Sequence, residues 1–380
     1  MPVIPYLKKR IGESYLVWFE NSNMYIQFEK PAWFVFRKVV SRCKTATIAH
    51  EFAIRYGVPP DQSLSFVQDI RAEIEKMNKE EVAQNNTSLI SEELNSHVFI
   101  PYAIHYYRLG NQLISFSYES RLFEHYLHPL MAHFETTEKS TGMPLFELFD
   151  HQGQIVFRFN GDVKGIWTNE ETNFVKGLIF MFLLNVMHGK TDADWLMTVH
   201  ASAITNGRKT ILFSAAPGKG KTTIAALLQA RGYRLISDDF VPIDRSTFCA
   251  YPFPIAMSVK EGSMDLLASL YPELEQKTLN FITPEKSVRY LPPVHHPDVT
   301  SDIYPVKAFI FIQYDSSVDF LMEKLDPLKA MKLLFEEAWV SPAHGNATLL
   351  FELITQISFY QLTYSNNHKA LDAITNLFRV

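Results

Sequence analysis

The sequence predicts an α/β protein in which a small α+β domain precedes a longer α/β domain. Three observations predict this organisation. Strand-like runs and helical patterns fill residues 1–80, and an apolar strand runs through a glycine-containing turn into a helix at residues 210–231. Between them, residues 81–96 are rich in Asn, Glu and Ser, a composition typical of a linker. The predicted domains are therefore residues 1–80 and 97–380.

The composition limits the classes of function. A chain of 380 residues with 47% hydrophobic content supports two or three domains with sizeable cores. Its formal net charge of −5 gives no overall basic character, so we expect no nucleic-acid partner. The longest apolar run, residues 177–187, is too short to span a bilayer, and the N-terminus lacks a signal-peptide core. Two scattered cysteines, Cys43 and Cys249, fit a reducing compartment, and we expect a cytoplasmic protein without a membrane partner.

Residues 1–80 show the pattern of a hairpin followed by three helices. Asn21, Ser22 and Asn23 form a turn between two strand-like runs, Pro31 is suited to open a helix, and Gly57 is suited to end one. This order is winged-helix-like. The expected elements are strands at 15–19 and 24–28 and helices that begin near residues 31, 46 and 61.

The longer domain shows mixed helical and strand periodicity. The expected strands lie at residues 98–102, 113–118, 154–159, 165–168, 210–214, 233–236, 306–313 and 319–324. The expected helices lie at residues 120–133, 170–188, 221–231, 327–339 and 369–379.

The turn at residues 215–223 carries the pattern of a phosphate-binding loop. A strand, a tight turn that ends in Gly-Lys-Thr, and a helix present backbone N–H groups and a helix N-terminus to phosphates. Lys221 is placed to reach the outer phosphates, and the hydroxyl of Thr222 is placed to bind Mg²⁺. The usual first glycine is replaced by Ala215, which the turn tolerates if its φ stays negative. The predicted nucleotide-binding residues are Ala215, Ala216, Pro217, Gly218, Lys219, Gly220, Lys221, Thr222 and Thr223.

Asp238 and Asp239 end the strand that follows this helix. If the two strands pair in parallel, their carboxyl ends share one edge of the sheet, and the acidic pair lies near Lys221 and Thr222. One carboxylate is then available to hold Mg²⁺ and the other to accept a proton from an attacking hydroxyl. The alternative interpretation is a helix cap or a solvated turn.

Further candidates surround these motifs. His200 precedes the phosphate strand and is placed to lend charge or to orient the acidic pair. Positive charge near the γ-phosphate favours its transfer, and Arg289 is the first candidate for that role, with Lys260 the second. The alternative interpretation of both is an ordinary surface charge.

The three motifs around His200, Lys221 and Asp238 stand at the mutual spacing of the HPr kinase/phosphorylase superfamily, and the chain resembles its HPr-kinase-like members. The resemblance implies the fold of that superfamily and of phosphoenolpyruvate carboxykinase, ATP and Mg²⁺ as cofactors, and transfer to a serine hydroxyl. It implies that Lys221 binds the β- and γ-phosphates, Thr222 ligates Mg²⁺, and Asp238 is the general base. It also implies that His200 belongs to the active site, that Asp239 supports metal or base, and that Glu261 stands for a further metal ligand. The sequence leaves open which aspartate is base and which supports metal.

The N-terminal module resembles the PqqD-like peptide-recognition fold. The hairpin, the run Pro31-Ala-Trp-Phe-Val-Phe-Arg, the run Lys44-Thr-Ala-Thr-Ile-Ala and the run Tyr56-Gly-Val carry this resemblance. Such domains bind the leader of a ribosomally made, modified peptide by strand addition at a sheet edge. A generic winged-helix domain is the alternative.

These observations predict a kinase that phosphorylates a peptide or small protein, with the N-terminal domain raising the effective concentration of the acceptor. Two alternatives stay open: a nucleotide-gated peptide-binding module without transfer, and a kinase for a small molecule such as free serine. A homo-oligomer also stays open.

Overall fold

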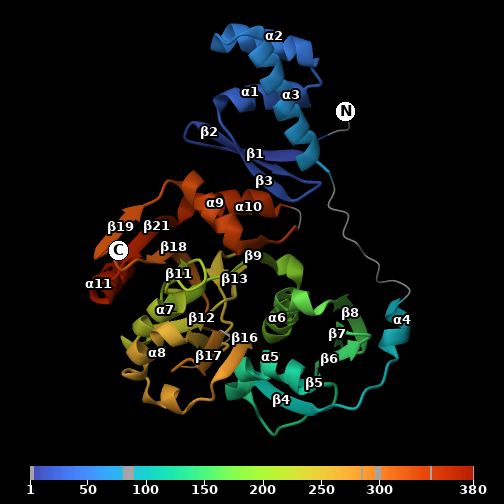
Figure 1. Cartoon of the computed structure of the whole chain (residues 1–380), viewed down its shortest axis with the longest axis vertical. Coiled ribbons are helices and arrows are strands. Elements are labelled where there is room, and N and C mark those ends of the chain that lie inside the picture. The colour runs from blue at the N-terminus through green and yellow to red at the C-terminus, as the bar shows by residue number, and fades with distance from the viewer. Residues whose placement is uncertain (1–3, 80–89, 284–285, 296–300, 343–344, 380) are drawn as a thin grey trace. The chain divides into compact units, whose positions relative to one another are not determined.

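The computed structural model describes residues 4–79, 90–283, 286–295, 301–342 and 345–379. It is a mixed α/β structure with several sheets and two compact units (Figure 1). Unit 1 contains residues 1–84 and 342–354, and unit 2 contains residues 85–341 and 355–380. Residues 80–89 of the predicted linker lie outside the described residues.

Unit 1 is built on a three-stranded antiparallel sheet in the order β1-β2-β3, followed by three helices. Apolar residues of β2 and of all three helices form its core, with Phe36, Val39 and Val67 fully buried. The first strand was not predicted, because its Lys8, Lys9 and Arg10 are exposed and break any apolar alternation. The elements are β1 (Tyr6–Ile11), β2 (Ser14–Phe19), β3 (Met24–Phe28), α1 (Lys30–Val40), α2 (Thr45–Tyr56), α3 (Pro60–Met77) and most of α10 (Asn346–Gln356).

Unit 2 begins with a five-stranded sheet in the order β4-β5-β6-β7-β8. Two helices, α5 and α6, contribute buried side chains to the same core as this sheet, among them Leu127 and Leu183. The apolar run at 177–187 therefore belongs to a core helix. The elements are α4 (Ile90–Asn95), β4 (Ala103–Leu109), β5 (Gln112–Tyr118), α5 (Arg121–Met131), η1 (Ala132–Phe134), β6 (Leu145–His151), β7 (Gln154–Phe159), β8 (Asp162–Trp167), η2 (Asn169–Glu171), α6 (Thr172–His188) and η3 (Asp192–Asp194).

A ten-stranded sheet forms the centre of unit 2, in the order β12-β10-β11-β18-β14-β13-β9-β20, with β21 joining both β18 and β19. Helices α7 and α11 share a buried apolar core with its strands. The elements are β9 (Trp195–Val199), β10 (Ser202–Thr205), β11 (Thr210–Ser214), α7 (Lys221–Ala230), β12 (Arg234–Ser237), β13 (Val241–Asp244), β14 (Cys249–Ala250), β18 (Tyr304–Tyr314), β19 (Phe320–Lys324), α9 (Pro327–Glu337), β20 (Ala338–Val340), β21 (Ser358–Tyr364) and α11 (Asn367–Arg379).

A small antiparallel sheet in the order β15-β17-β16 completes unit 2. Val259 and Leu291 from this sheet pack in the same core as α7 and α8. The elements are β15 (Met257–Lys260), α8 (Glu261–Ala268), η4 (Pro272–Gln276), β16 (Asn280–Thr283) and β17 (Lys286–Leu291).

Three expectations about elements were wrong. Residues 98–102 form no strand, because Val98 and Ile100 are almost fully exposed, and pairing with β5 starts at Ala103. The helix predicted to reach Trp339 ends at Glu337, and the next residues form β20 beside β9. The strands β11 and β12 do not pair, because β10 lies between them and is antiparallel to both.

The end of the predicted linker also differs from the expectation. Residues 90–95 form α4, and the side chain of Leu94 is buried against Phe149 and Val156 of the five-stranded sheet. Arg158 donates to the carbonyls of Leu94, Asn95 and His97, so this part of the chain is held by unit 2.

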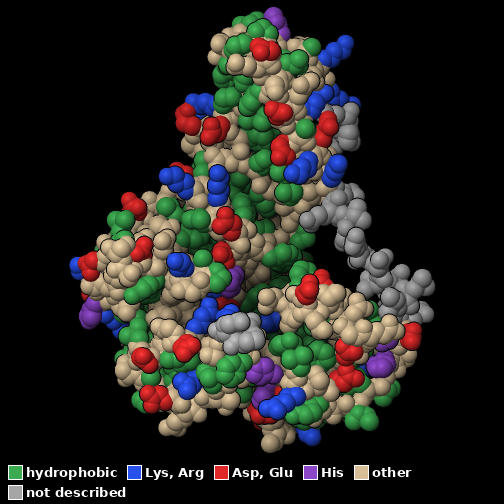
Figure 2. Space-filling view, viewed as in Figure 1, with side chains coloured by type: hydrophobic (Ala, Val, Ile, Leu, Met, Phe, Trp, Pro, Cys, Tyr) green, Lys and Arg blue, Asp and Glu red, His purple; other side chains and the backbone are tan. Residues whose placement is uncertain are grey.

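The visible surface carries charges of both signs. On the face drawn in Figure 2, acidic and basic side chains are interspersed over each unit rather than separated by sign. Among the described residues, we find no helix with the length and apolar character needed to cross a bilayer.

Candidate active site

The turn between β11 and α7 depends on glycine. Gly218 and Gly220 have φ angles of 83° and 97°, a region that L side chains rarely adopt. A Cβ on Gly220 would also lie 2.8 Å from the hydroxyl oxygen of Tyr364. Ala215 is not among the residues with positive φ, which satisfies the condition for an alanine there. The glycine-containing loop therefore places Lys221 and Thr222 at the N-terminus of α7.

Two pairs of side chains join this turn to the end of β12. Lys221, only 8% exposed, places its Nζ 2.5 Å from Oδ1 of Asp239. The hydroxyl of Thr222 donates to Oδ2 of Asp238 at 3.1 Å. The other oxygen of Asp238 accepts from the hydroxyl of Ser202, and the Asp238 side chain is almost wholly buried. The phosphate-type turn and both carboxylates thus converge.

The sheet topology explains this convergence. Because β10 is antiparallel to both β11 and β12, those two strands point the same way and end at the same edge. Strands β9 and β10 are separated by His200 and Ala201 alone, yet they lie far apart in the strand order. The sheet must therefore curl, and its corner brings His200 to the edge where β11 and β12 end.

His200 bridges two carboxylates. Its Nε2 lies 3.3 Å from Oδ1 of Asp239, and its Nδ1 lies 3.0 Å from Oε2 of Glu337 at the end of α9. The backbone N–H of His200 also donates to the carbonyl of Glu337 at 2.7 Å. The half-exposed Asp239 is therefore held by Lys221 on one side and by the His200–Glu337 pair on the other.

The two aspartates have opposite electrostatic environments. Burial raises the pKa of Asp238 to about 6, with a further contribution from the negative charge of Asp239. Burial also acts to raise the pKa of Asp239, but the charge of Lys221 and the hydrogen bonds of His200 and Lys221 outweigh it and lower that pKa. Asp239 is the ionised member of the pair, and Asp238 is the one that takes up a proton first.

Two lysines, Lys260 on β15 and Lys176 on α6, lie near the acidic pair, and both also feel the charge of Lys286 on β17. Burial lowers the pKa of both Lys260 and Lys176, and the charges of Asp238 and Asp239 partly offset this effect. Burial raises the pKa of Tyr290 to about 12, with a contribution from Asp239. These side chains are therefore within electrostatic reach of the carboxylates.

Arg289, the first sequence candidate for the γ-phosphate, lies on the opposite face of the small sheet. Lys260 pairs with Val288, so Lys260, Lys286 and Tyr290 share one face, while Arg289 pairs with Val259 on the other. The guanidinium of Arg289 donates to the carbonyl of Lys277 at 3.1 Å and contacts Sδ of Met264 at 3.8 Å. The alternation of strand side chains thus favours Lys260, the second candidate, over Arg289.

Glu261, the further metal ligand that the resemblance implies, lies at the start of α8. It opens α8 as an exposed residue, and the hydrogen bonds and ion pairs found for Asp238 and Asp239 in the described part of the chain do not include it.

Three site residues had no assigned role in the sequence analysis. Ser202 stands two residues after His200, and the alternation of side chains along a strand could have placed it with His200 beside the ends of β11 and β12. Glu337 comes from α9, 137 residues after His200, and only the fold brings the two together. Lys176 begins the apolar part of α6, where an isolated cation on a core helix was the available signal.

Comparison with solved structures finds distant likenesses. Among solved structures, the chain is similar to the HPr(Ser) kinase/phosphatase of Coxiella burnetii, with 12% sequence identity and a TM-score of 0.20. The match covers 48% of this chain and 88% of that protein. No family model matches the chain, and no curated protein matches it.

Proposed function

We propose that this protein is an ATP- and Mg²⁺-dependent kinase that transfers the γ-phosphoryl group to a serine hydroxyl of a peptide bound by unit 1. The observation that carries the proposal is the convergence of Lys221 and Thr222 with Asp239 and Asp238 at one sheet edge. A turn that exposes backbone N–H groups, a lysine and two carboxylates are the recurring parts of phosphoryl-transfer sites.

The donor set fits Mg²⁺. The Thr222 hydroxyl and the Asp238 carboxylate are hard oxygen ligands that already lie 3.1 Å apart. Bound Mg²⁺ would neutralise charge on the β- and γ-phosphates. We therefore assign Asp238 to the metal, the reverse of the role that the family resemblance implies.

Asp239 is assigned as the general base. It is the more exposed of the two carboxylates, so it is the one that an acceptor hydroxyl can reach, and its lowered pKa keeps it ionised. When Lys221 turns to the nucleotide phosphates, Asp239 loses a hydrogen-bonding cation and becomes more basic. It then takes the serine proton while the serine oxygen bonds to the γ-phosphorus and the bond from phosphorus to the leaving ADP oxygen breaks. His200, held by Glu337, orients Asp239.

Unit 1 supplies the support for a peptide acceptor. A cavity of about 380 Å³ is lined by four cationic side chains, one acidic side chain and four aromatic rings. Tyr15 and Trp33 stack at 4.3 Å, and Arg55 lies over the ring of Phe34 at 5.2 Å. Cations beside aromatic rings favour acidic and aromatic side chains. The lining residues are Arg10, Glu13, Tyr15, Lys30, Trp33, Phe34, Arg37, Arg55 and Tyr56.

The proposal is tested with the full chain, Mg·ATP and a set of serine-containing peptides, with and without acidic-aromatic leader segments. We expect mass spectrometry to find phosphoserine in leader-bearing peptides. The double variant R37E/R55E should raise the KM for such peptides about tenfold, an effect of ~1.4 kcal/mol, with kcat unchanged. The matched control is Lys76→Glu, an exposed charge reversal on the same unit outside the cavity.

The other outcomes decide between the alternatives. ATP consumption without phosphate on any peptide would favour a nucleotide-gated binding module. Phosphorylation of free serine at equal rates by the wild type and R37E/R55E would favour a small-molecule kinase.

The pKa of Asp238 predicts an acid limb in the pH profile. Below about pH 6 the free enzyme carries a proton on Asp238, which Mg²⁺ must displace, so log kcat/KM should fall towards a slope of one per pH unit. Above that pH the carboxylate is free and the limb flattens. Steady-state rates from pH 4.5 to 8, with circular dichroism to confirm folding, measure this. A profile that stays flat through pH 6 contradicts the metal role of a titrating Asp238.

A further inference from the structure

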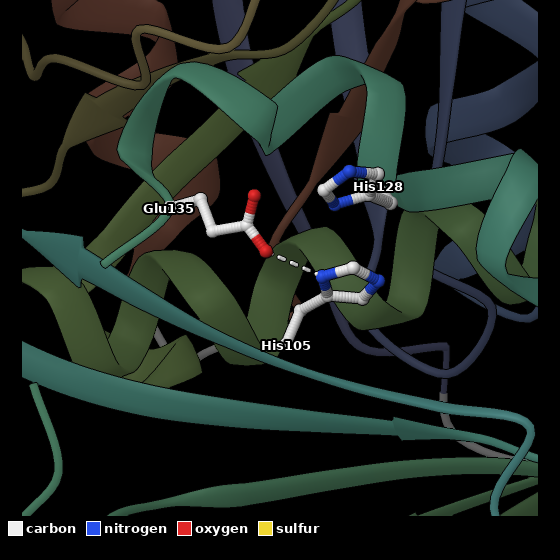
Figure 3. A group of neighbouring side chains, drawn as sticks. All are labelled: His105, His128 and Glu135. Atoms are coloured by element: carbon white, nitrogen blue, oxygen red, sulfur yellow. Dashed lines mark hydrogen bonds and ion pairs between the residues drawn. The ribbon is translucent and has the colours of Figure 1, made fainter. Parts of the chain in front are cut away.

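A second cluster of ligating side chains lies in unit 2, outside the candidate active site. His105 comes from β4, His128 from α5 and Glu135 from the segment after η1 (Figure 3). One ligand atom from each lies within 4.8 Å of the other two. Among the described residues, no other set of three or more His, Cys, Asp or Glu side chains is gathered this closely. Three separate elements thus present nitrogen and oxygen donors to one point.

His105 is held between two carboxylates. Its Nδ1 lies 2.6 Å from Oε1 of Glu135, and its Nε2 lies 2.7 Å from Oε1 of Glu124 on α5. A metal-bound histidine commonly uses one ring nitrogen for the metal and donates the other N–H to a carboxylate. In His105, Nδ1 beside Glu135 would be the metal-binding nitrogen, and Nε2 beside Glu124 would donate its N–H to that carboxylate.

His128 stacks on His105 and has its own orienting contact. The ring centroids are 3.9 Å apart with an interplanar angle of 18°, and Nδ1 of His128 lies 2.9 Å from the hydroxyl of the buried Tyr107. Two imidazole rings this close are unfavourable when both are protonated, whereas two neutral rings can share a cation.

The charge balance also favours a divalent cation. Two carboxyl groups, those of Glu124 and Glu135, flank His105, and the charge of a 2+ ion would match their combined charge. Ligand bonds of ~2.1 Å in tetrahedral geometry separate two donors by about 3.4 Å. His105 and Glu135, at 2.6 Å, would need to move apart by less than 1 Å, and the His128 ring would turn out of the stack.

We propose that His105, His128 and Glu135 form a zinc site, with Glu124 orienting His105. Two imidazoles and one carboxylate are a ligand set that suits Zn²⁺ rather than Mg²⁺, which prefers oxygen. The ion would tie β4 to α5 and to the segment after η1. This proposal is independent of the proposed kinase function.

The test uses the full chain without added histidines, stripped with a chelator and titrated with ZnCl₂ in excess MgCl₂ by calorimetry. We expect one zinc ion per chain and a higher thermal midpoint with zinc. His128→Gln and Glu135→Gln should each abolish stoichiometric binding, and Glu124→Gln should weaken it about 10–100-fold. His125→Gln is the matched control, because His125 lies on the same helix but contacts the carbonyl of Phe281.

A spectroscopic measurement keeps the test decisive if a variant folds poorly. Co²⁺ in place of zinc should give the intense visible absorption of a tetrahedral nitrogen and oxygen site in the wild type and in His125→Gln. The proposal is overturned if the stripped wild type takes up no stoichiometric zinc. It is also overturned if folded His128→Gln binds zinc as tightly as the wild type.

Discussion

Asp239→Asn should abolish phosphoryl transfer and leave the binding of Mg·ATP nearly intact. The amide is close in shape to the carboxylate but cannot accept the serine proton, and loss of a general base costs about 10²–10⁴ in rate. The neighbouring Thr222 and Asp238 keep their contact, so the metal site survives. Single-turnover transfer to a leader-bearing peptide and titration with a fluorescent ATP analogue measure the two effects separately.

Asp319→Asn is the control for this experiment, because Asp319 is an exposed aspartate paired with Lys369 and remote in sequence from the site. A folded Asp239→Asn protein that transfers phosphate at the wild-type single-turnover rate would falsify the assignment of the base.

Asp238→Asn should remove the Mg²⁺ requirement from nucleotide binding and lower transfer by at least about 10²-fold. The metal's charge stabilisation is worth several kcal/mol, and each ~1.4 kcal/mol is a factor of ten. The affinity for ATP should then be the same in the presence of a chelator as in millimolar MgCl₂. Titrations of binding and of single-turnover rate against MgCl₂ test this.

The fold should tolerate this substitution. The folded-state pKa of Asp238, about 6, lies above the ordinary value of 3.8, so the ionised form is the less favoured one in the folded protein. The stability that the neutral form contributes is present at low pH and is lost as the pH rises through about 6. Asn resembles that neutral form, so the thermal midpoint near pH 7 should not fall. If instead Asp238→Asn keeps its Mg²⁺ dependence and Asp239→Asn loses it, the two roles are reversed.

The local structure of the site was largely predictable from sequence. The strand at 210–214 and the helix from Lys221 match the structure to within one residue at each end, because a short apolar run, glycine and helical spacing are local signals. The proximity of Asp238 and Asp239 to the turn also followed from the order strand, helix, strand. The reason differed from the expected direct pairing, since β10 separates β11 and β12.

The long-range parts of the site were not predictable in this way. Arg289 and Lys260 are equally basic in the sequence, and only the register of β15 against β17 shows which of them faces the carboxylates. Glu337 meets His200 because the sheet curls and α9 ends beside β9, a contact that no local pattern encodes. His105, His128 and Glu135 are likewise spread over a hairpin, a helix and a loop.

The contact between Gly220 and Tyr364 has a consequence for biosynthesis. Tyr364 ends β21, which pairs in parallel with β18, and the N–H of Tyr314 at the end of β18 donates to the carbonyl of Lys219 at 3.2 Å. The phosphate turn is thus braced by β18 and β21, which follow it in the chain. A nascent or prematurely stopped chain that lacks β21 lacks this brace, so it would not acquire a finished nucleotide cradle.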